Sequence, residues 1–240
     1  MINLQPITQQ TVEQFAITAI IDTALCVGAG GSSGSLADKP IVRTANGRLL
    51  IPASQIKGRL RHECEKIARG LGWCVCESPK ANTMCPQRAG LADEIENKFQ
   101  RQYQQTHPNH YHCLICQIFG NPSLPSRLDF NDLVCSEPKE NLPEVLRPGV
   151  TINRRRRTAE EKKLYFLETS AANLKLAFTG AIQIYPDAPP QTKPLIQAAL
   201  KHINALGGSK SAGLGWLSWQ VEPWQIDDST WQDLIPGGAA

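Results

Sequence analysis

Residues 51–61 read IPASQIKGRLR, and this stretch predicts a helix that runs from Pro52 to Gly70. Ser54 is the predicted N-cap, because its hydroxyl can accept a hydrogen bond from a free backbone N–H of the first turn. Apolar residues then recur at i, i+4, i+8 and i+11 and form one stripe that can pack against a sheet. The residues of this stripe are Ile56, Leu60, Cys64 and Ile67.

The start of this helix is a candidate anion site. A helix N-terminus leaves backbone N–H groups without intrahelical partners and carries a partial positive charge, so a phosphate group fits there. Lys57 and Arg61 lie one turn apart and add positive charge on the same side. An ordinary capped helix with a solvated basic face is the alternative interpretation. The predicted phosphate contacts are Ser54, Lys57 and Arg61.

A glycine-rich loop, residues 207–216, reads GGSKSAGLGW. Its four glycines permit positive φ and a close approach of the backbone to a ligand. The loop is not a Walker motif, because no Gly-Lys-Ser or Gly-Lys-Thr closes it. A helix C-cap that runs into a turn is the alternative. The predicted ligand contacts are Gly208, Ser209, Lys210 and Ser211.

Four consecutive arginines form the third basic element. Strand-like arms at 149–152 and 163–169 flank them, so a projecting β-hairpin is predicted over 147–169 with the arginines at its tip. Arginine suits both phosphates and the faces of bases, although a charge run can also be a solvated surface. The predicted nucleic-acid contacts in this hairpin are Arg154, Arg155, Arg156 and Arg157.

The order of predicted elements indicates an α+β fold in one domain, residues 1–240. Strands are expected at 14–28, 174–185 and 216–221, and a second helix at 194–206. Helices on one face of an antiparallel sheet fit this order, and the split βαβ arrangement of the ferredoxin-like and RNA-recognition folds fits best.

Composition sets limits on the class of protein. A hydrophobic content of 41% excludes global disorder, and a net charge of +3 does not by itself indicate nucleic acid. The longest apolar stretch, 15–21, is too short to span a bilayer, and no signal peptide is recognised. A soluble cytoplasmic protein without a membrane partner is therefore expected. In the reducing cytoplasm its eight cysteines are expected to be thiols or metal ligands rather than disulfides.

Residues 73–120 form a polar, cysteine-rich stretch that is predicted to be an inserted subdomain. Its Cys113-x-x-Cys116 motif has the spacing of a zinc knuckle. Only one of Cys74 and Cys76 is expected to ligate, since their side chains sit well apart in an extended chain. The predicted structural zinc ligands are Cys76, Cys85, Cys113 and Cys116. His107, His110 and His112 are substitutes, and a disordered loop with incidental thiols is the alternative.

Asp38 is the only carboxylate in the glycine- and serine-rich region beside the first helix. An aspartate in a loop is usually a turn former. The functional alternative is that it holds a divalent cation, or positions a 2′-hydroxyl, during RNA cleavage.

Taken as an ordered set, these elements resemble the RAMP superfamily of CRISPR-associated proteins, and in particular the repeating backbone subunit of type III effector complexes. The Cys-x-x-Cys motif followed by Phe119-Gly120 is similar to the zinc-bearing versions of that family. The matching segments are Leu25–Gly31, Asp38–Val42, Ile51–Arg61, Arg147–Ala159 and Gly207–Gly215.

The resemblance implies a ferredoxin-like palm with a thumb hairpin, assembled with other CRISPR effector subunits along a guide RNA. The palm helix and the glycine loop would hold guide phosphates, and the thumb would kink the duplex of guide and target RNA. Asp38 would then support target cleavage with a divalent cation such as Mg²⁺. Departures from the family pattern bear on cleavage more than on binding; they are Cys26, Ala53, Gln55, Asn153 and Ala212.

Three other functions are open at this point. The first is a non-catalytic structural subunit with the same guide contacts. The second is a standalone RNA-processing endonuclease, for which His62 or His202 would be the general base. The third is a zinc-stabilised module without a role in RNA binding.

Overall fold

The structure is a computed structural model that describes residues 11–28, 37–80, 83–85, 103, 111–222 and 234. Residues 29–36 of the glycine- and serine-rich region predicted over Gly28–Leu36, together with His107 and His110, lie outside the described residues. Among the described helices, none combines the length and the apolar character needed to span a bilayer.

The centre of the molecule is a six-stranded antiparallel sheet. Its strand order is β2-β4-β7-β1-β8, and β3 also pairs with β7. Side chains alternate between the two faces of a strand, so one face of β1 and β7 supplies much of the core. The strands are β1 (Glu13–Ile21), β2 (Leu50–Ile51), β3 (Leu128–Phe130), β4 (Leu133–Cys135), β7 (Leu176–Ile184) and β8 (Leu217–Glu222).

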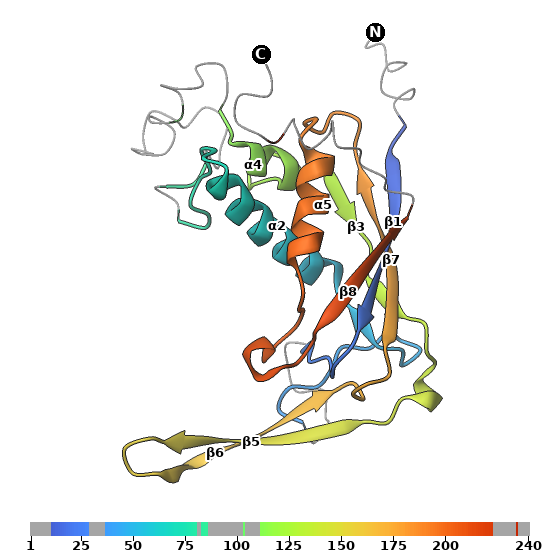
Figure 1. The fold of residues 1–240 in the computed structure, drawn as a ribbon, viewed down its shortest axis with the longest axis vertical. Coiled ribbons are helices and arrows are strands. Elements are labelled where there is room, and N and C mark those ends of the chain that lie inside the picture. Colours follow the sequence, from blue (N-terminus) through green and yellow to red (C-terminus); the bar gives the residue numbers. More distant parts are fainter. Residues whose placement is uncertain are drawn as a thin grey trace.

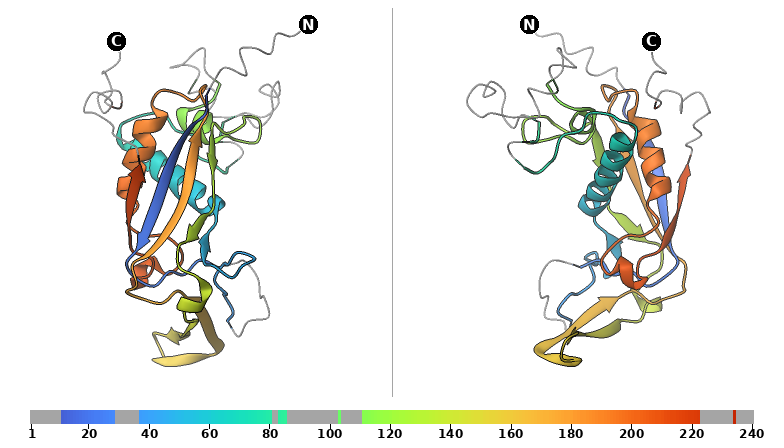
Figure 2. Two further views of the ribbon diagram at one scale, coloured as in Figure 1. Left: turned by 90° about the vertical axis from the view of Figure 1, so that its right-hand side faces the viewer. Right: turned by 60° about the vertical axis from the view of Figure 1, so that its left-hand side comes forward.

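Two helices cover one face of this sheet (Figure 2). They are α2 (Ala53–Gly70) and α5 (Thr192–His202), and the buried Cys64 thiol of α2 approaches the Leu195 carbonyl oxygen of α5 at 3.8 Å. A short helix, α4 (Leu114–Phe119), lies near the C-terminal half of α2 (Figure 1). The mixed α and β architecture with antiparallel strands agrees with the fold class expected from the sequence.

A second, two-stranded sheet forms a hairpin that projects from one end of the main sheet (Figure 1). Its strands are β5 (Val145–Asn153) and β6 (Thr158–Thr169), and the four arginines form the turn between them. The Asn153 side-chain oxygen accepts hydrogen bonds from the backbone N–H groups of Arg155 and Arg156 at 3.1 Å each. The basic run therefore occupies a turn, in which the strand alternation of side chains does not apply.

Two predicted elements have different bounds in the structure. The first strand ends at Ile21 rather than near residue 28, and beyond it Gly28 forms only an isolated bridge with Ile41. The predicted helix 194–206 spans Thr192–His202, because Ile203 has extended backbone angles that end it.

Candidate nucleic-acid interface and metal centre

The N-terminus of α2 already holds an anionic group of this chain. The Ala53 N–H donates to Oδ1 of Asp132 at 2.7 Å. Pro52 is the N-cap residue and no side chain caps the helix from that position, so the prediction of Ser54 as N-cap is wrong. Ser54 lies inside the first turn, where a ligand phosphate would have to share the helix terminus with the Asp132 carboxylate.

Lys57 lies one turn further along α2 and faces an acidic neighbour. Burial lowers the pKa of Lys57, and the charge of Asp129 on β3 acts in the opposite direction. Asp129 in turn accepts a 2.6 Å hydrogen bond from the Tyr185 hydroxyl. The Lys57 ammonium is therefore partly balanced within the chain, and a phosphate contact there would have to compete with Asp129.

Arg61 is committed to three acceptors. Its Nε donates to Glu65 at 3.1 Å, Nη1 donates to the Gly120 carbonyl oxygen at 2.9 Å, and Nη2 lies 3.5 Å from Cys116 Sγ. Burial lowers the pKa of Arg61, but the nearby Cys116 and Glu65 outweigh it and the net pKa is raised. The residue that the sequence predicts as a phosphate contact thus also joins α2 to α4.

The glycine loop packs against the segment that follows β1. A Cβ at Gly207 would lie 2.4 Å from the Cys26 carbonyl oxygen, and one at Gly215 would lie 1.9 Å from the Leu206 carbonyl oxygen. The Gly208 N–H donates to that same Cys26 oxygen at 2.7 Å. At least two of the four glycines are therefore required by the chain's own packing. The carbonyl group of Cys26 takes part in this packing, and no local sequence pattern indicates that role.

Lys210 opens a single 3-10 turn (Lys210–Ala212) and faces a different flank of α2 from Lys57. Burial and the charge of Arg59 lower its pKa, while Glu63 raises it. Residues two apart on a helix point about 200° apart, so Arg59 and Lys57 lie on opposite flanks. Lys57, near the start of α2, and Lys210 of the glycine loop therefore lie on opposite sides of α2.

Asp38 sits at the base of the hairpin. Its Oδ2 accepts a hydrogen bond from the Phe166 N–H at 2.7 Å, and its own N–H donates to the Phe166 carbonyl oxygen at 3.0 Å. Nearby, the buried Glu168 carboxylate accepts from the Ile41 N–H at 3.0 Å and from Arg43 Nη2 at 2.8 Å. The segment that carries Asp38 is thus attached to β6 by backbone and side-chain bonds.

The arginine turn lies at the far end of the same hairpin from Asp38. Phe166 is eight positions from Thr158 along β6, which corresponds to roughly 25 Å of extended strand. The glycine loop, by contrast, is close to the hairpin base, since Leu25 beside Cys26 exchanges hydrogen bonds with Ser170 at 2.8 and 2.9 Å. These elements share one end of the main sheet (Figure 1).

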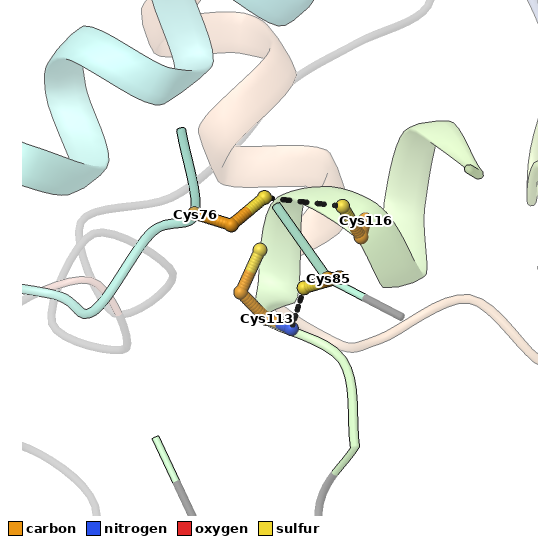
Figure 3. A group of neighbouring side chains, drawn as sticks. All are labelled: Cys76, Cys85, Cys113 and Cys116. Carbon is orange, nitrogen blue, oxygen red and sulfur yellow. Dashed lines mark hydrogen bonds between the residues drawn. The ribbon is translucent and has the colours of Figure 1, made fainter. Parts of the chain in front are cut away.

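The four predicted zinc ligands converge beside α4 (Figure 3), and α4 lies at the end of the molecule away from the hairpin (Figure 1). The sulfurs of Cys76, Cys85, Cys113 and Cys116 all lie within 4.8 Å of one another, and each of these residues is at most 1% exposed. Among the described residues, this is the only such group of His, Cys, Asp or Glu, and neither Cys74 nor His112 belongs to it.

The sulfur geometry of this cysteine cluster suits a tetrahedral metal ion. Four sulfurs at about 2.3 Å from one zinc would lie about 3.8 Å apart, whereas a disulfide needs about 2.05 Å. The sulfurs of Cys76 and Cys116 are 3.6 Å apart. Hydrogen bonds with the other thiols lower the pKa of Cys113, and the bond with Cys116 has the largest effect. The hydrogen bond between Cys85 and Cys113 raises the pKa of Cys85. The cluster can hold a metal ion, which is compatible with structural zinc.

Two comparisons with known proteins identify the family to which the chain belongs. A relative from Methanocaldococcus jannaschii, described as the CRISPR system Cms endoribonuclease Csm3, is 25% identical over 216 residues, which cover 83% of this chain and 75% of the relative. The family model of the RAMP superfamily matches residues 18–218, a range that contains α2, the cysteine cluster, the hairpin and the glycine loop. The chain therefore belongs to the RAMP superfamily.

Proposed function

We propose that this chain is a backbone subunit of a type III CRISPR ribonucleoprotein, that it binds guide RNA, and that it cleaves complementary target RNA. The observation that carries the proposal is the 25% identity, across 83% of this chain, to a protein named as a CRISPR endoribonuclease. The proposed setting is the cytoplasm, and the proposed partners are guide RNA, target RNA and the other effector subunits.

In this proposal the main sheet with α2 and α5 is a ferredoxin-like palm, and the β5–β6 hairpin is the thumb. Guide phosphates would lie along α2 and the glycine loop. This assignment is supported by the glycine loop, because its exposed Lys210 lies near the positive charges of Arg59 and Lys66 on α2. The proposed guide contacts from the palm are Ser54, Lys57, Arg61, Gly208, Ser209, Lys210 and Ser211.

The thumb would act on the duplex. Its turn presents four exposed arginines at the end of a hairpin that leaves the body of the protein (Figure 1). Guanidinium groups can bind phosphates and can also stack on bases that have left the helical stack. A thumb of this kind would kink the duplex and expose one linkage of the target strand at the hairpin base.

Asp38 would support cleavage at that linkage. The 2′-hydroxyl would lose its proton to solvent and its oxygen would attack the adjacent phosphorus. The bond from phosphorus to the 5′-oxygen of the next nucleotide would break, and that oxygen would take a proton from solvent, leaving a cyclic phosphate and a 5′-hydroxyl. A divalent cation bound there would stabilise the developing charge. Because Asp38 belongs to no group of three or more ligand side chains among the described residues, RNA oxygens would have to complete the coordination.

A non-catalytic RNA-binding subunit of the same complex is the second candidate function. The hydrogen bond from Phe166 to Oδ2 of Asp38 favours it, since this bond gives the carboxylate a structural role that needs no chemistry. Both candidates place the same surfaces on guide RNA. They differ only in whether the negative charge of Asp38 is required for cleavage.

Purification of the assembled complex through a tag on this chain tests the proposal. The expected result is co-purification of the other subunits with RNA of discrete guide length, together with cleavage of a complementary target. A matched preparation in which the four arginines of the turn are replaced by glutamine should keep the subunits and lose target cleavage. A complex that carries no discrete RNA would refute RNA binding and with it both candidate functions.

A further inference from the structure

The guanidinium of Arg61 joins three separate structural features. Glu65 is one turn along α2, Gly120 ends α4, and Cys116 is a member of the cysteine cluster within α4. The two contacts to α4 span 55 and 59 residues of sequence. Arg61 therefore has one side bound to its own helix and the other bound to the segment that carries a proposed metal ligand.

The part of α4 that Arg61 contacts is rigidly defined. The Gly120 N–H donates to the Cys116 carbonyl oxygen at 2.9 Å. Gly120 has φ of +81°, and a Cβ there would lie 2.8 Å from the Ser126 backbone nitrogen, so only glycine fits this turn. By contacting both the Gly120 oxygen and the Cys116 sulfur, Arg61 fixes the last turn of α4, and hence the position of the Cys116 side chain.

The charge of Arg61 matches what a metal would create. A zinc ion with four thiolates carries a net charge of about −2, because each coordinating thiol is deprotonated. Burying such a charge is costly unless cations and hydrogen-bond donors face it. Arg61 brings a positive charge and an N–H donor to Cys116, and Arg69 of the same helix donates to the Cys76 carbonyl oxygen at 3.2 Å.

We propose that Arg61 is a positioning residue for the metal at the cysteine cluster, which orients Cys116 and compensates the charge of the thiolates. The inference rests on metal binding at the cysteine cluster, which the four converging sulfurs support. It is independent of whether the chain binds RNA. Removing a partner that orients a metal ligand typically weakens metal affinity by about 10–100-fold, and this range is the effect expected here.

The test compares three variants of the full chain with the unaltered protein. Arg61→Gln removes the charge, and Arg61→Lys keeps the charge but cannot reach all three acceptors. Arg59→Gln is the matched control, since Arg59 lies on another flank of α2, has nearly the same side-chain exposure (23% against 22%) and also makes an ion pair with the residue four positions on. Zinc affinity is measured by chelator competition, and the Co²⁺-loaded proteins are compared by absorption.

Arg61→Gln should bind Zn²⁺ about 10–100-fold more weakly, Arg61→Lys should fall between it and the unaltered protein, and Arg59→Gln should be unchanged. Loss of an N–H···S hydrogen bond makes the sulfur a stronger electron donor. The thiolate-to-Co²⁺ band should therefore move to lower energy in Arg61→Gln and not in Arg59→Gln, which a general loss of stability would not produce.

The outcomes distinguish a failure of the Arg61 role from a failure of metal binding by the cysteine cluster. If the unaltered protein binds neither Zn²⁺ nor Co²⁺ through its cysteines, the metal site fails and the inference fails with it. If the unaltered protein binds metal and both Arg61 variants match its affinity and its Co²⁺ spectrum, only the role of Arg61 is overturned. If Arg61→Gln does not fold, Arg61→Lys decides alone, and an affinity and a Co²⁺ spectrum equal to those of the unaltered protein would overturn the role of Arg61.

Discussion

The carboxylate of Asp38 accepts a 2.7 Å hydrogen bond from the backbone N–H of Phe166, and the N–H of Asp38 donates back to the Phe166 carbonyl oxygen at 3.0 Å. The candidate catalytic residue is therefore attached to the base of the hairpin rather than to the sheet alone. A change in the angle of the hairpin would move Asp38 with it, so the proposed duplex binding at the tip and the proposed cleavage site would be mechanically connected.

The buried ion pair between Arg43 and Glu168 should be the main support of this attachment. The side chains are 18% and 7% exposed, and Arg43→Met would leave the Glu168 charge without its closest cation. The expected loss in the free energy of unfolding is about 3 kcal/mol, the low end of the range for breaking a buried pair, because Arg43 is partly exposed. Urea denaturation of the chain measures it.

Glu144→Gln is the control for that measurement. Glu144 lies 3.9 Å from the same Arg43 guanidinium but is 65% exposed, so its removal should cost less than about 1 kcal/mol. Equal losses for Arg43→Met and Glu144→Gln would show that burial of Glu168 does not strengthen the attachment.

The arginine turn should set part of the salt dependence of RNA binding. For each phosphate that the protein no longer binds, the slope of log K against log salt concentration should fall by about 0.7 to 0.9. Replacing Arg155 and Arg156 with glutamine should therefore reduce the slope by about 1.4 to 1.8, if each binds one phosphate. Fluorescence anisotropy of a guide–target duplex with the assembled complex, over a salt series, measures this change.

Lys193→Gln is the matched control for charge, because Lys193 forms an ion pair with Glu13 at the start of α5, away from the hairpin. It should leave the slope unchanged. A slope that is the same in the arginine variant and in the unaltered complex would remove the turn from the RNA-binding surface.

Metal content should depend on the cluster cysteines and not on their neighbour. Cys85 contributes one of four converging sulfurs, so Cys85→Ser should purify with much less zinc than the unaltered chain and should melt at a lower temperature. Cys74→Ser should keep its zinc, because Cys74 is only partly buried and lies outside the group. Elemental analysis decides between them, and zinc loss from Cys74→Ser would contradict the assignment of ligands.

Gly215 should tolerate substitution less well than Gly213. Both have positive φ, +71° and +84°, which costs an alanine about 1–2 kcal/mol. Only Gly215 also faces a backbone oxygen, whereas a Cβ at Gly213 meets nothing within 4 Å. Thermal unfolding should therefore show a larger destabilisation for Gly215→Ala, and equal effects would mean that the loop does not pack against residues 24–26 and 206 as described.

The sequence predicts the regular elements well because their signals are local. The apolar stripe of α2, the alternation in β7 and the turn of the arginine hairpin each lie within one short segment, and the structure places helix, strand and hairpin there. The four cysteines that the sequence predicts as zinc ligands do lie together in the structure, since a Cys-x-x-Cys pair needs two more ligands and the chain offers few cysteines nearby. That they bind zinc stays a prediction.

The interactions at the candidate site could not be predicted in this way, because they join residues far apart in sequence. The acceptor of the Ala53 N–H is Asp132, 79 residues away, so the neighbouring residues alone give no sign that the helix start is occupied. The sequence likewise favoured ligand contact for the glycine loop, whereas Gly207 is required by the distant Cys26 carbonyl oxygen.

Target cleavage by the assembled complex carrying Asp38→Asn is the most direct measurement of the central proposal. Asparagine keeps an oxygen that can accept the hydrogen bond from Phe166 but lacks the negative charge, whereas Asp38→Ala loses both. The account predicts that both variants assemble and bind guide RNA, and that both lose the cut beside this subunit. An Asp38→Asn complex that retains every cut of the unaltered complex would contradict it.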